Sequence, residues 1–260
     1  MTSLSGKTAL VLGATNPGNM GDAIARLYAA EGAKVILAGR KRAALEDLAR
    51  EINAGVELCD IAEEQQVVAL AEAIKANYGQ LDIVANTVGV TGPIPLSEAT
   101  QENLDWLMRT NFQGPLFLLK HVCPLMPSGS AVVMVTSVAA EAHKYTPTRI
   151  PYACSKASIN RLVQGVAIEL GQQGIQINAI APGLVITPMG AAAMGDLGEQ
   201  LEQQLKQKTP MGRLATVEDI ANTALFLVQG RYFDTGQIIQ VNGGFSLLDS
   251  GIVLGGNAQE

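Results

Sequence analysis

Two residues four positions apart, Tyr152 and Lys156, have the side chains needed for acid–base chemistry at an oxygen atom. Residues i and i+4 share one face of an α-helix, so the phenol and the ammonium group would point into one cleft. Free tyrosine has a pKa of about 10 and is a poor base near neutral pH. Because a nearby cation favours tyrosinate, we expect Lys156 to lower the pKa of Tyr152 toward the working range.

A glycine-rich stretch between residues 13 and 21 is the second feature with chemical meaning. It follows a short apolar run and precedes a helical pattern. Glycines at a strand-to-helix turn let the backbone approach a pyrophosphate closely, and the helix N-terminus supplies free N–H groups and a partial positive charge. The stretch is therefore typical of a dinucleotide-binding turn, with an ordinary glycine-rich turn as the alternative.

The end of the second apolar run is where dinucleotide enzymes that prefer NAD carry an acidic residue. This sequence has no acid there and reads Ala38-Gly39-Arg40-Lys41. A carboxylate would repel a 2′-phosphate, whereas an arginine can hold it with two hydrogen bonds. We therefore expect NADP(H) to be favoured over NAD(H), with Arg40 at the 2′-phosphate. The alternative is that Arg40 only begins the next helix on a solvated face.

These residues need elements that bring them together, and strand-like and helix-like segments alternate along the whole chain. Most strand-like runs are continuously apolar, which is typical of parallel strands covered on both faces. The helical segments between them carry apolar stripes suited to packing on a sheet. The pattern predicts a single α/β domain over residues 1–260, with a doubly wound, seven-stranded parallel sheet and helices on both faces. The strand-like runs are 8–12, 34–38, 56–58, 81–85, 131–135, 176–180 and 237–241.

Composition excludes several classes of protein. The net charge is −6 and the largest basic cluster is 40–42, so the chain lacks the basic face that nucleic-acid binding requires. The three cysteines, Cys59, Cys123 and Cys154, have no metal-ligand spacing, so we predict no metal site and a reducing compartment. The N-terminal apolar run is too short for a signal peptide and no stretch is long enough to span a membrane, so we expect a cytoplasmic protein without a membrane partner.

Over nearly its whole length the sequence resembles the short-chain dehydrogenase/reductase family, and in particular its ketoreductase-like members. The resemblance rests on the Tyr152–Lys156 pair, the glycine-rich turn and the motifs that follow three later strand-like runs. Those motifs are Asn86-Thr87-Val88-Gly89, Val135-Thr136-Ser137 and the segment from Asn178 to Gly183, with Thr187-Pro188-Met189 just beyond. The resemblance implies a Rossmann-type fold and a nicotinamide-dependent oxidoreductase.

The resemblance gives catalytic roles to four residues. Tyr152 is implied to exchange a proton with the reacting oxygen, with Lys156 beside it. Ser137 matches the family's serine that hydrogen-bonds and orients the substrate oxygen. Asn111 matches the asparagine that holds a water molecule in the proton relay to the lysine.

The resemblance also implies the cofactor contacts. Asp60 matches the residue that contacts the adenine, Asn86 and Gly89 brace the loop beside the cofactor, and the segment 182–187 holds the nicotinamide carboxamide. The implied cofactor-binding residues are Gly13, Thr15, Asn16, Gly18, Met20, Gly21, Arg40, Lys41, Asp60, Ile61, Asn86, Gly89, Tyr152, Lys156, Pro182, Gly183, Val185 and Thr187.

The glycine-rich turn leaves the reaction open between two branches of the family. From Gly13 to Gly21 it is about two residues longer than is usual, a length also seen in the enoyl-reductase branch. That branch spaces tyrosine and lysine further apart than this chain does. We therefore favour reduction of a ketone, or oxidation of the secondary alcohol, over enoyl reduction. A non-catalytic NADP(H)-binding sensor is a third alternative, against which the complete set of four catalytic residues argues.

The expected substrate is a small carbonyl or alcohol compound with a hydrophobic body. Residues of about 184–210 would form a lid over it, and apolar side chains such as Met189 and Leu197 make that segment adaptable. The segments 126–130 and 171–176 lack Lys and Arg, so docking of an acidic carrier protein is not favoured.

Two further expectations concern the surface. His143, Lys144 and Arg149 either contact an acidic group of the substrate or lie in a solvated loop. The family commonly forms homotetramers through its long central helices and last strand, so the resemblance implies a homotetramer, or else a homodimer.

Overall fold

The computed structural model describes residues 2–141, 147–185, 187 and 198–247. Within these residues, seven strands form one parallel sheet in the order β3-β2-β1-β4-β5-β6-β7. The strands are β1 (Thr8–Leu12), β2 (Lys34–Gly39), β3 (Gly55–Leu58), β4 (Ile83–Asn86), β5 (Ala131–Val135), β6 (Gln176–Pro182) and β7 (Ile238–Val241). The predicted doubly wound parallel sheet is confirmed.

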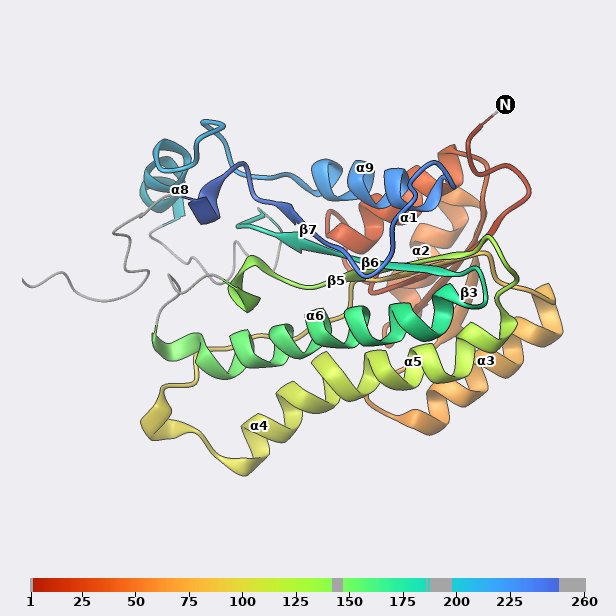
Figure 1. The fold of residues 1–260 in the computed structure, drawn as a ribbon, viewed down its shortest axis with the longest axis horizontal. Coiled ribbons are helices and arrows are strands. Elements are labelled where there is room, and N and C mark those ends of the chain that lie inside the picture. Colours follow the sequence, from red (N-terminus) through yellow and green to blue (C-terminus); the bar gives the residue numbers. More distant parts are fainter. Residues whose placement is uncertain (1, 142–146, 186, 188–197, 248–260) are drawn as a thin grey trace, which may run out of the picture.

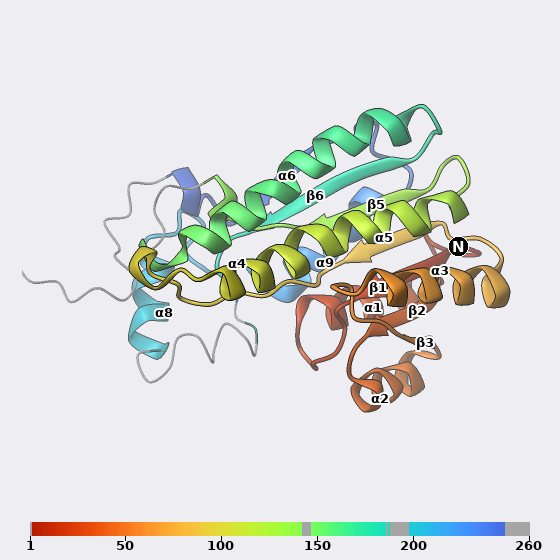
Figure 2. The same cartoon turned by 90° about the horizontal axis from the view of Figure 1, so that it is seen from below.

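Helices cover the sheet on both faces (Figures 1 and 2). One layer holds α3, α5 and α6, and the other holds α1, α2 and α9, with α4 leading into α5. The helices are α1 (Met20–Ala30), α2 (Arg42–Ile52), α3 (Glu64–Tyr78), α4 (Gln101–Met108), α5 (Gly114–Val122), α6 (Ile150–Gly171), α8 (Gly198–Gln207) and α9 (Val217–Val228).

The two hydrophobic cores explain why the strands are apolar throughout. Leu10 and Leu12 of β1 point into the core beneath α3, α5 and α6. Ala9 and Val11 of the same strand point into the core beneath α1, α2 and α9. Because successive side chains of a strand alternate between faces, a strand with helices on both sides needs apolar residues at every position.

Two strand ends differ by two residues from the sequence-based bounds, and four others differ by one residue. β4 begins at Ile83 rather than at 81, because Asp82 is engaged before the ladder starts: its carboxylate accepts a hydrogen bond from the Thr8 backbone at 2.9 Å. β6 continues to Pro182 rather than ending at 180, because it pairs with β7 as far as Val241. The extension carries the segment 182–185 further along the edge where the other site residues lie.

All seven strands run in the same direction, so the loops that leave their carboxyl ends gather at one edge. The glycine-rich turn after β1, the basic pair after β2, Asp60 after β3 and Ser137 after β5 belong to that edge. Open α/β sheets bind their ligands there. In the described part of the chain, no helix is both long enough and apolar enough to cross a membrane.

Candidate active site

The glycine-rich turn takes a shape that larger residues would prevent. Gly13 has a φ of +94°, a conformation that favours glycine, and a Cβ there would lie 2.4 Å from Thr87 Oγ1. A Cβ on Gly21 would lie 2.8 Å from the backbone nitrogen of Ala14. The start of the turn and the first turn of α1 are therefore in direct backbone contact.

Helix α1 begins beside this turn with its N-terminus capped by Asn19, whose Oδ1 accepts a hydrogen bond from the Asp22 backbone at 2.8 Å. The earlier helical N–H groups, of Met20 and Gly21, have no acceptor among the described residues. Unsatisfied N–H groups at a helix N-terminus are ready donors to an anion. The turn thus offers what a diphosphate requires.

A cavity of about 220 Å³ lies along this turn. It brings together residues from the turn, from the ends of β2, β3 and β4, and from the segment after β6. Ten of the predicted cofactor residues line it: Gly13, Thr15, Asn16, Met20, Arg40, Lys41, Asp60, Ile61, Gly89 and Thr187. Eight others do not form its wall: Gly18, Gly21, Asn86, Tyr152, Lys156, Pro182, Gly183 and Val185.

Several of these eight residues shape the site from outside the cavity wall. Asn86, which is buried, accepts a hydrogen bond from the Val88 backbone at 3.1 Å and so shapes the loop that leads to Gly89. Gly183 lies against Asn242, where a Cβ would be 2.7 Å from the asparagine Cβ. Val185 forms an isolated parallel bridge with Ala215. These contacts place the loops that reach the cavity.

One end of the cavity is polar and carries the basic pair. Arg40 lies 3.5 Å from the Asp60 carboxylate, with a largely exposed guanidinium group. Lys41 Nζ donates to Asn16 Oδ1 at 3.2 Å, so the long glycine-rich turn reaches across to the end of β2. The two cations and the Asn16 amide form a cluster that suits a phosphate monoester beside a ribose.

Helix α6 positions the Tyr152–Lys156 pair beneath the loop after β4. Lys156 is 5% exposed, and its Nζ donates to the Val135 carbonyl at 3.2 Å. A Cβ on Gly89 would lie only 2.7 Å from that Nζ, so glycine leaves the room that the ammonium occupies. Burial lowers the pKa of Lys156 to about 8, since a charged amine is poorly solvated there.

The pKa of Tyr152 is raised rather than lowered, which corrects the sequence-based expectation. Burial of the phenol is the largest cause and raises the pKa, while a side-chain hydrogen bond with Ser137 and the charge of Arg149 lower it. The expectation assigned the decisive effect to Lys156, but the lysine ammonium bonds the Val135 carbonyl instead. Tyr152 is thus a protonated acid in this state of the site, next to the hydroxyl of Ser137.

Asn111 sits in a π-helical turn, Arg109–Gln113, between α4 and α5. Its Oδ1 accepts from the Val90 backbone at 2.8 Å, and its Nδ2 donates to the Val90 carbonyl at 2.9 Å and to Ser155 Oγ at 2.9 Å. Ser155 Oγ in turn donates to the carbonyl of Tyr152 at 2.7 Å. The Asn111 side chain therefore ties the loop after β4 to α6; the water relay implied by resemblance stays a prediction.

Two further hydrogen bonds connect the segment that follows β5 to α6. Thr136 Oγ1 donates to the carbonyl of Lys156 at 3.1 Å. Glu141 accepts from Asn160 of α6 at 3.1 Å and from Gln240 of β7 at 2.9 Å. Ser137 lies between these two anchors, so its position relative to Tyr152 is set on both sides.

Sequence reasoning missed several residues of the cavity wall, namely Leu12, Asn19, Gly39, Cys59, Thr87, Val88, Val90 and Thr110. Most of them neighbour predicted residues in the sequence, so adjacency alone could have found them. Asn19 gave a different signal, because an asparagine before an apolar helical stripe is a typical N-cap. Its second bond, from Nδ2 to the Gly13 carbonyl at 2.9 Å, was not foreseeable from the sequence.

Part of the predicted substrate region lies outside the described residues, including His143, Lys144, Met189 and Leu197. Of the basic loop, Arg149 is described, and its Nη1 donates to Thr91 Oγ1 at 3.3 Å. Of the predicted lid, α8 is described, and its Leu205 packs with Leu214 and Phe245 in a small separate cluster.

Comparisons with known proteins find relatives over nearly the whole chain. A family model described as Enoyl-(Acyl carrier protein) reductase matches residues 13–246. A gluconate 5-dehydrogenase of Gluconobacter oxydans (strain 621H) is 32% identical over 94% of this chain and 96% of its own. The 7alpha-hydroxysteroid dehydrogenase of Escherichia coli (strain K12) is 33% identical over 93% of this chain and 94% of its own.

A solved structure extends the likeness to the fold. It is a gluconate 5-dehydrogenase from Burkholderia cenocepacia J2315, in complex with NADP and tartrate. Its TM-score is 0.86 at 28% identity, with 94% of this chain and 97% of that chain covered. The chain belongs to the short-chain dehydrogenase/reductase family, NAD(P)-dependent oxidoreductases that act on CH–OH and C=O groups.

Proposed function

We propose that this protein is an NADP(H)-preferring reductase that converts a ketone to a secondary alcohol, or catalyses the reverse oxidation, with Tyr152 as the acid/base. The observation that carries the proposal is the convergence of Tyr152, Ser137, Lys156 and Asn111 at the sheet edge that also holds the cavity. Their contacts come from β5, α6 and the π-helical turn, which are distant in the sequence.

The chemistry follows from the protonation states of the site. A bound dinucleotide would supply hydride to the carbonyl carbon, or accept it from the alcohol carbon. In reduction the carbonyl oxygen gains negative charge, and the raised pKa of Tyr152 keeps its phenol protonated at neutral pH, so that a proton is available for that oxygen. Ser137, hydrogen-bonded to the same phenol, donates to or accepts from the oxygen and orients it. Lys156, with a pKa of about 8, exchanges a proton easily near neutral pH and so serves to reprotonate the site.

The preference for NADP(H) is supported by the basic end of the cavity. Arg40 and Lys41 both line it, and the residue before them, Gly39, has no carboxylate to grip a ribose 2′-hydroxyl. The solved gluconate 5-dehydrogenase from B. cenocepacia contains NADP. We expect Arg40→Asp to weaken NADPH binding about tenfold or more and to affect NADH far less. A tighter dissociation constant for NADH than for NADPH in the wild-type protein would contradict this preference.

The enoyl-reductase alternative has one observation in its favour, the description of the matching family model. The spacing of Tyr152 and Lys156 on α6 argues against it, because the enoyl-reductase branch spaces these two residues further apart. In this chain Tyr152 forms a hydrogen bond with Ser137, and Lys156 lies against Gly89. The relatives described above act on alcohols by name. We therefore propose carbonyl chemistry and treat enoyl reduction as an outcome of the test.

We propose a small-molecule substrate with a hydrophobic body, bound beside Tyr152 and beneath the predicted lid of about 184–210. Buried Ile94 and the half-buried Val90, in the loop after β4, supply apolar surface near Asn111. The relatives that resemble this chain act on compounds as different as a sugar acid and a steroid, so their names select no single substrate.

We further propose that the chain assembles into a homotetramer, or a homodimer, and acts in the cytoplasm without nucleic-acid or membrane partners. Trp106 of α4, Leu116 of α5 and Ile168 of α6 are exposed by 43%, 37% and 70%. Exposed apolar side chains on neighbouring helices are typical of a subunit interface.

The deciding experiment measures oxidation of NADPH and NADH side by side against small ketones, 3-oxo esters and enones, with Tyr152→Phe as the control. Ketone-dependent turnover that is lost in the variant supports the proposal. Turnover with enones alone would move the protein to enoyl reduction. Binding of NADPH without turnover of any compound in the panel would favour the sensor alternative.

A further inference from the structure

Asp22 is a buried carboxylate near the N-terminus of α1, next to Asn19 and Met20, which line the cavity. It is 7% exposed and lies in the first turn of the helix. An acidic residue at this position stabilises the helix N-terminus, but it would also repel an anionic diphosphate brought to the same end. The hydrogen bonds of the Asp22 carboxylate indicate what this charge does beside a dinucleotide site.

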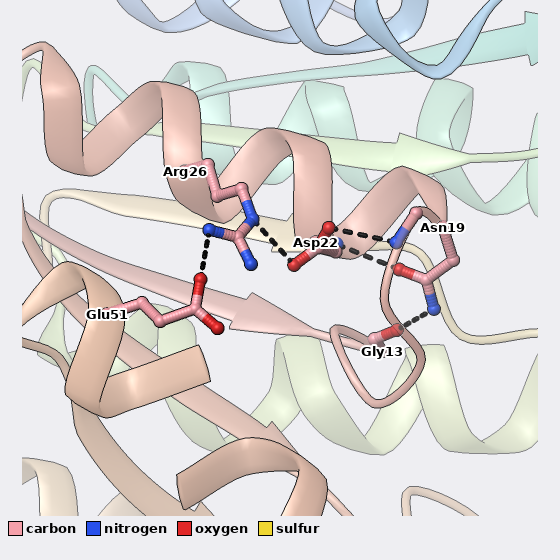
Figure 3. A network of polar contacts seen from close by, with 6 residues as sticks. Gly13, Asn19, Asp22, Arg26 and Glu51 are labelled. Carbon is pink, nitrogen blue, oxygen red and sulfur yellow. Dashed lines mark hydrogen bonds and ion pairs between the residues drawn. The ribbon is translucent and has the colours of Figure 1, made fainter. Parts of the chain in front are cut away.

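One carboxylate oxygen of Asp22, Oδ2, contacts the long glycine-rich turn (Figure 3). Its Oδ2 accepts a hydrogen bond from the Gly18 backbone at 3.0 Å. Beside it, Asn19 links the Asp22 backbone to the Gly13 carbonyl, at 2.8 and 2.9 Å. These three bonds hold both ends of the turn against α1. The extra length of the turn is thereby folded into one conformation that leaves the Met20 and Gly21 N–H groups free.

The other carboxylate oxygen of Asp22, Oδ1, forms an ion pair with Arg26. Arg26 lies one helical turn further on, and its Nε donates to Asp22 Oδ1 at 3.0 Å. The same guanidinium group donates to Glu51 of α2 through Nη1 at 2.7 Å, so it is held from both sides (Figure 3). Neither Asp22 nor Arg26 lines the cavity, so their influence on a bound dinucleotide is through the turn and through charge.

We propose that Asp22 and Arg26 are positioning residues for the diphosphate of the cofactor. Asp22 holds the glycine-rich turn in its binding shape, and Arg26 cancels the negative charge that Asp22 would otherwise present to the diphosphate. The inference rests on the proposed function, in which this cavity binds the dinucleotide.

The test compares dissociation constants of NADPH and NADH, measured by fluorescence titration without substrate, for the wild-type protein, Arg26→Met and Asp22→Asn/Arg26→Met. Methionine keeps the unbranched stem of Arg26 but leaves the Asp22 charge unpaired. We expect the single variant to weaken binding about three- to tenfold at low salt, and less at high salt because the repulsion is screened. The double variant removes the charge while asparagine still accepts from Gly18, so affinity should return to within about twofold of wild type.

Glu51→Gln is the matched control, because it removes the outer ion pair but leaves Arg26 beside Asp22; its dissociation constants should equal those of the wild type. A general folding defect in Arg26→Met would not be rescued by a second substitution at position 22. Unchanged affinity in Arg26→Met, or an equal loss in the double variant, would overturn the inference alone. Failure of the wild-type protein to bind either dinucleotide would overturn the proposed function, and the inference with it.

Discussion

The position proposed for Lys156 in catalysis has a cost in stability. Its pKa is lowered from the usual 10.5 to about 8 by burial, which corresponds to about 3 kcal/mol of unfavourable charging below pH 8. Between pH 8 and 10.5 the unfolded chain binds more protons at this side chain than the folded chain does. The folded state therefore gains stability from this residue as the pH rises through that window, and loses it as the pH falls.

Replacement of Lys156 by methionine should separate its proposed role in catalysis from its cost in stability. We expect Lys156→Met to abolish turnover but to raise the free energy of unfolding at pH 7 by about 1–3 kcal/mol, because an apolar stem fits the buried site. The gain should shrink as the pH rises from 8 through 10.5, because the wild-type amine is then neutral in the folded state and loses its proton in the unfolded state as well. Urea denaturation at pH 7 and pH 10 measures this, and an equal destabilisation at both values would contradict it.

Arg149 affects Tyr152 through its charge, which lowers the pKa of the phenol. Arg149→Gln should therefore raise that pKa further. In the proposed mechanism oxidation of an alcohol needs the tyrosinate, so the alkaline rise of kcat/KM in that direction should move to higher pH. Reduction near neutral pH, which uses the protonated phenol, should change little.

The conservative variant tests whether charge is the cause. Arg149→Lys keeps a cation in this loop and should restore most of the wild-type pH profile. If Arg149→Gln changes KM for an acidic substrate but leaves the oxidation profile in place, Arg149 binds substrate instead of tuning Tyr152.

At the scale of elements, Glu141 joins three parts of the fold that are far apart in the sequence. It follows β5 and the Ser137 turn, and its two oxygens accept from Asn160 of α6 and Gln240 of β7. Asn242, at the end of β7, donates to Gln240 at 3.1 Å and also lies against Gly183. The turn that carries Ser137 is thus connected to the segment after β6.

Loss of Glu141 should disturb catalysis more than cofactor binding. We expect Glu141→Ala to lower kcat about tenfold, because Ser137 loses one of its two anchors and small displacements of reacting groups are costly. The dissociation constant of NADPH should stay within about twofold of wild type, since Glu141 is not part of the cavity wall. Glu169→Ala, on the exposed face of α6, is the control, and equal losses in both variants would contradict a positioning role.

The elements themselves were predictable from the sequence because their signals are local. Continuous apolar runs marked the strands, and stripes such as Leu45, Leu48 and Ala49 marked the helix faces that the structure buries. The doubly wound parallel sheet then followed from general rules for alternating strands and helices. The π-helical turn of Asn111 was not predictable, because it depends on contacts with Val90 and Ser155 from other parts of the chain.

The site was predictable to the extent that its motifs are contiguous. Tyr152 and Lys156 share a helix, and the glycine-rich turn joins a strand to a helix, so both could be located from spacing. The direction of the Tyr152 pKa shift was predicted wrongly, because burial of the phenol depends on the packed protein and not on the lysine four residues away. The contacts of Asp22 and Arg26 with the turn and with α2 were not predicted from the sequence, because they depend on how these segments pack in the fold.

At the scale of the whole molecule, one helical layer carries apolar side chains that the protomer leaves exposed. Figure 2 shows α4, α5 and α6 beside one another on the same side of the sheet. Ile168 of α6 is 70% exposed, and Trp106 of α4 is 43% exposed. Burying such side chains against a second copy would contribute favourable free energy at about 25 cal/mol per Å² of apolar surface. An interface on this layer would also fix the position of α6, the helix that carries Tyr152 and Lys156.

Light scattering after size-exclusion chromatography tests this assembly. We expect the wild-type protein to have a mass about two or four times that of the 27.3 kDa chain. Ile168→Glu should shift the mass toward the protomer, because a carboxylate cannot be buried in an apolar interface without a partner. Gln65→Glu, an exposed position on α3, adds the same charge elsewhere and should leave the mass unchanged. A wild-type mass equal to one chain at micromolar concentration would contradict the assembly. If Ile168→Glu does dissociate the protein, a parallel fall in turnover would show that the site depends on a helix held by its neighbour.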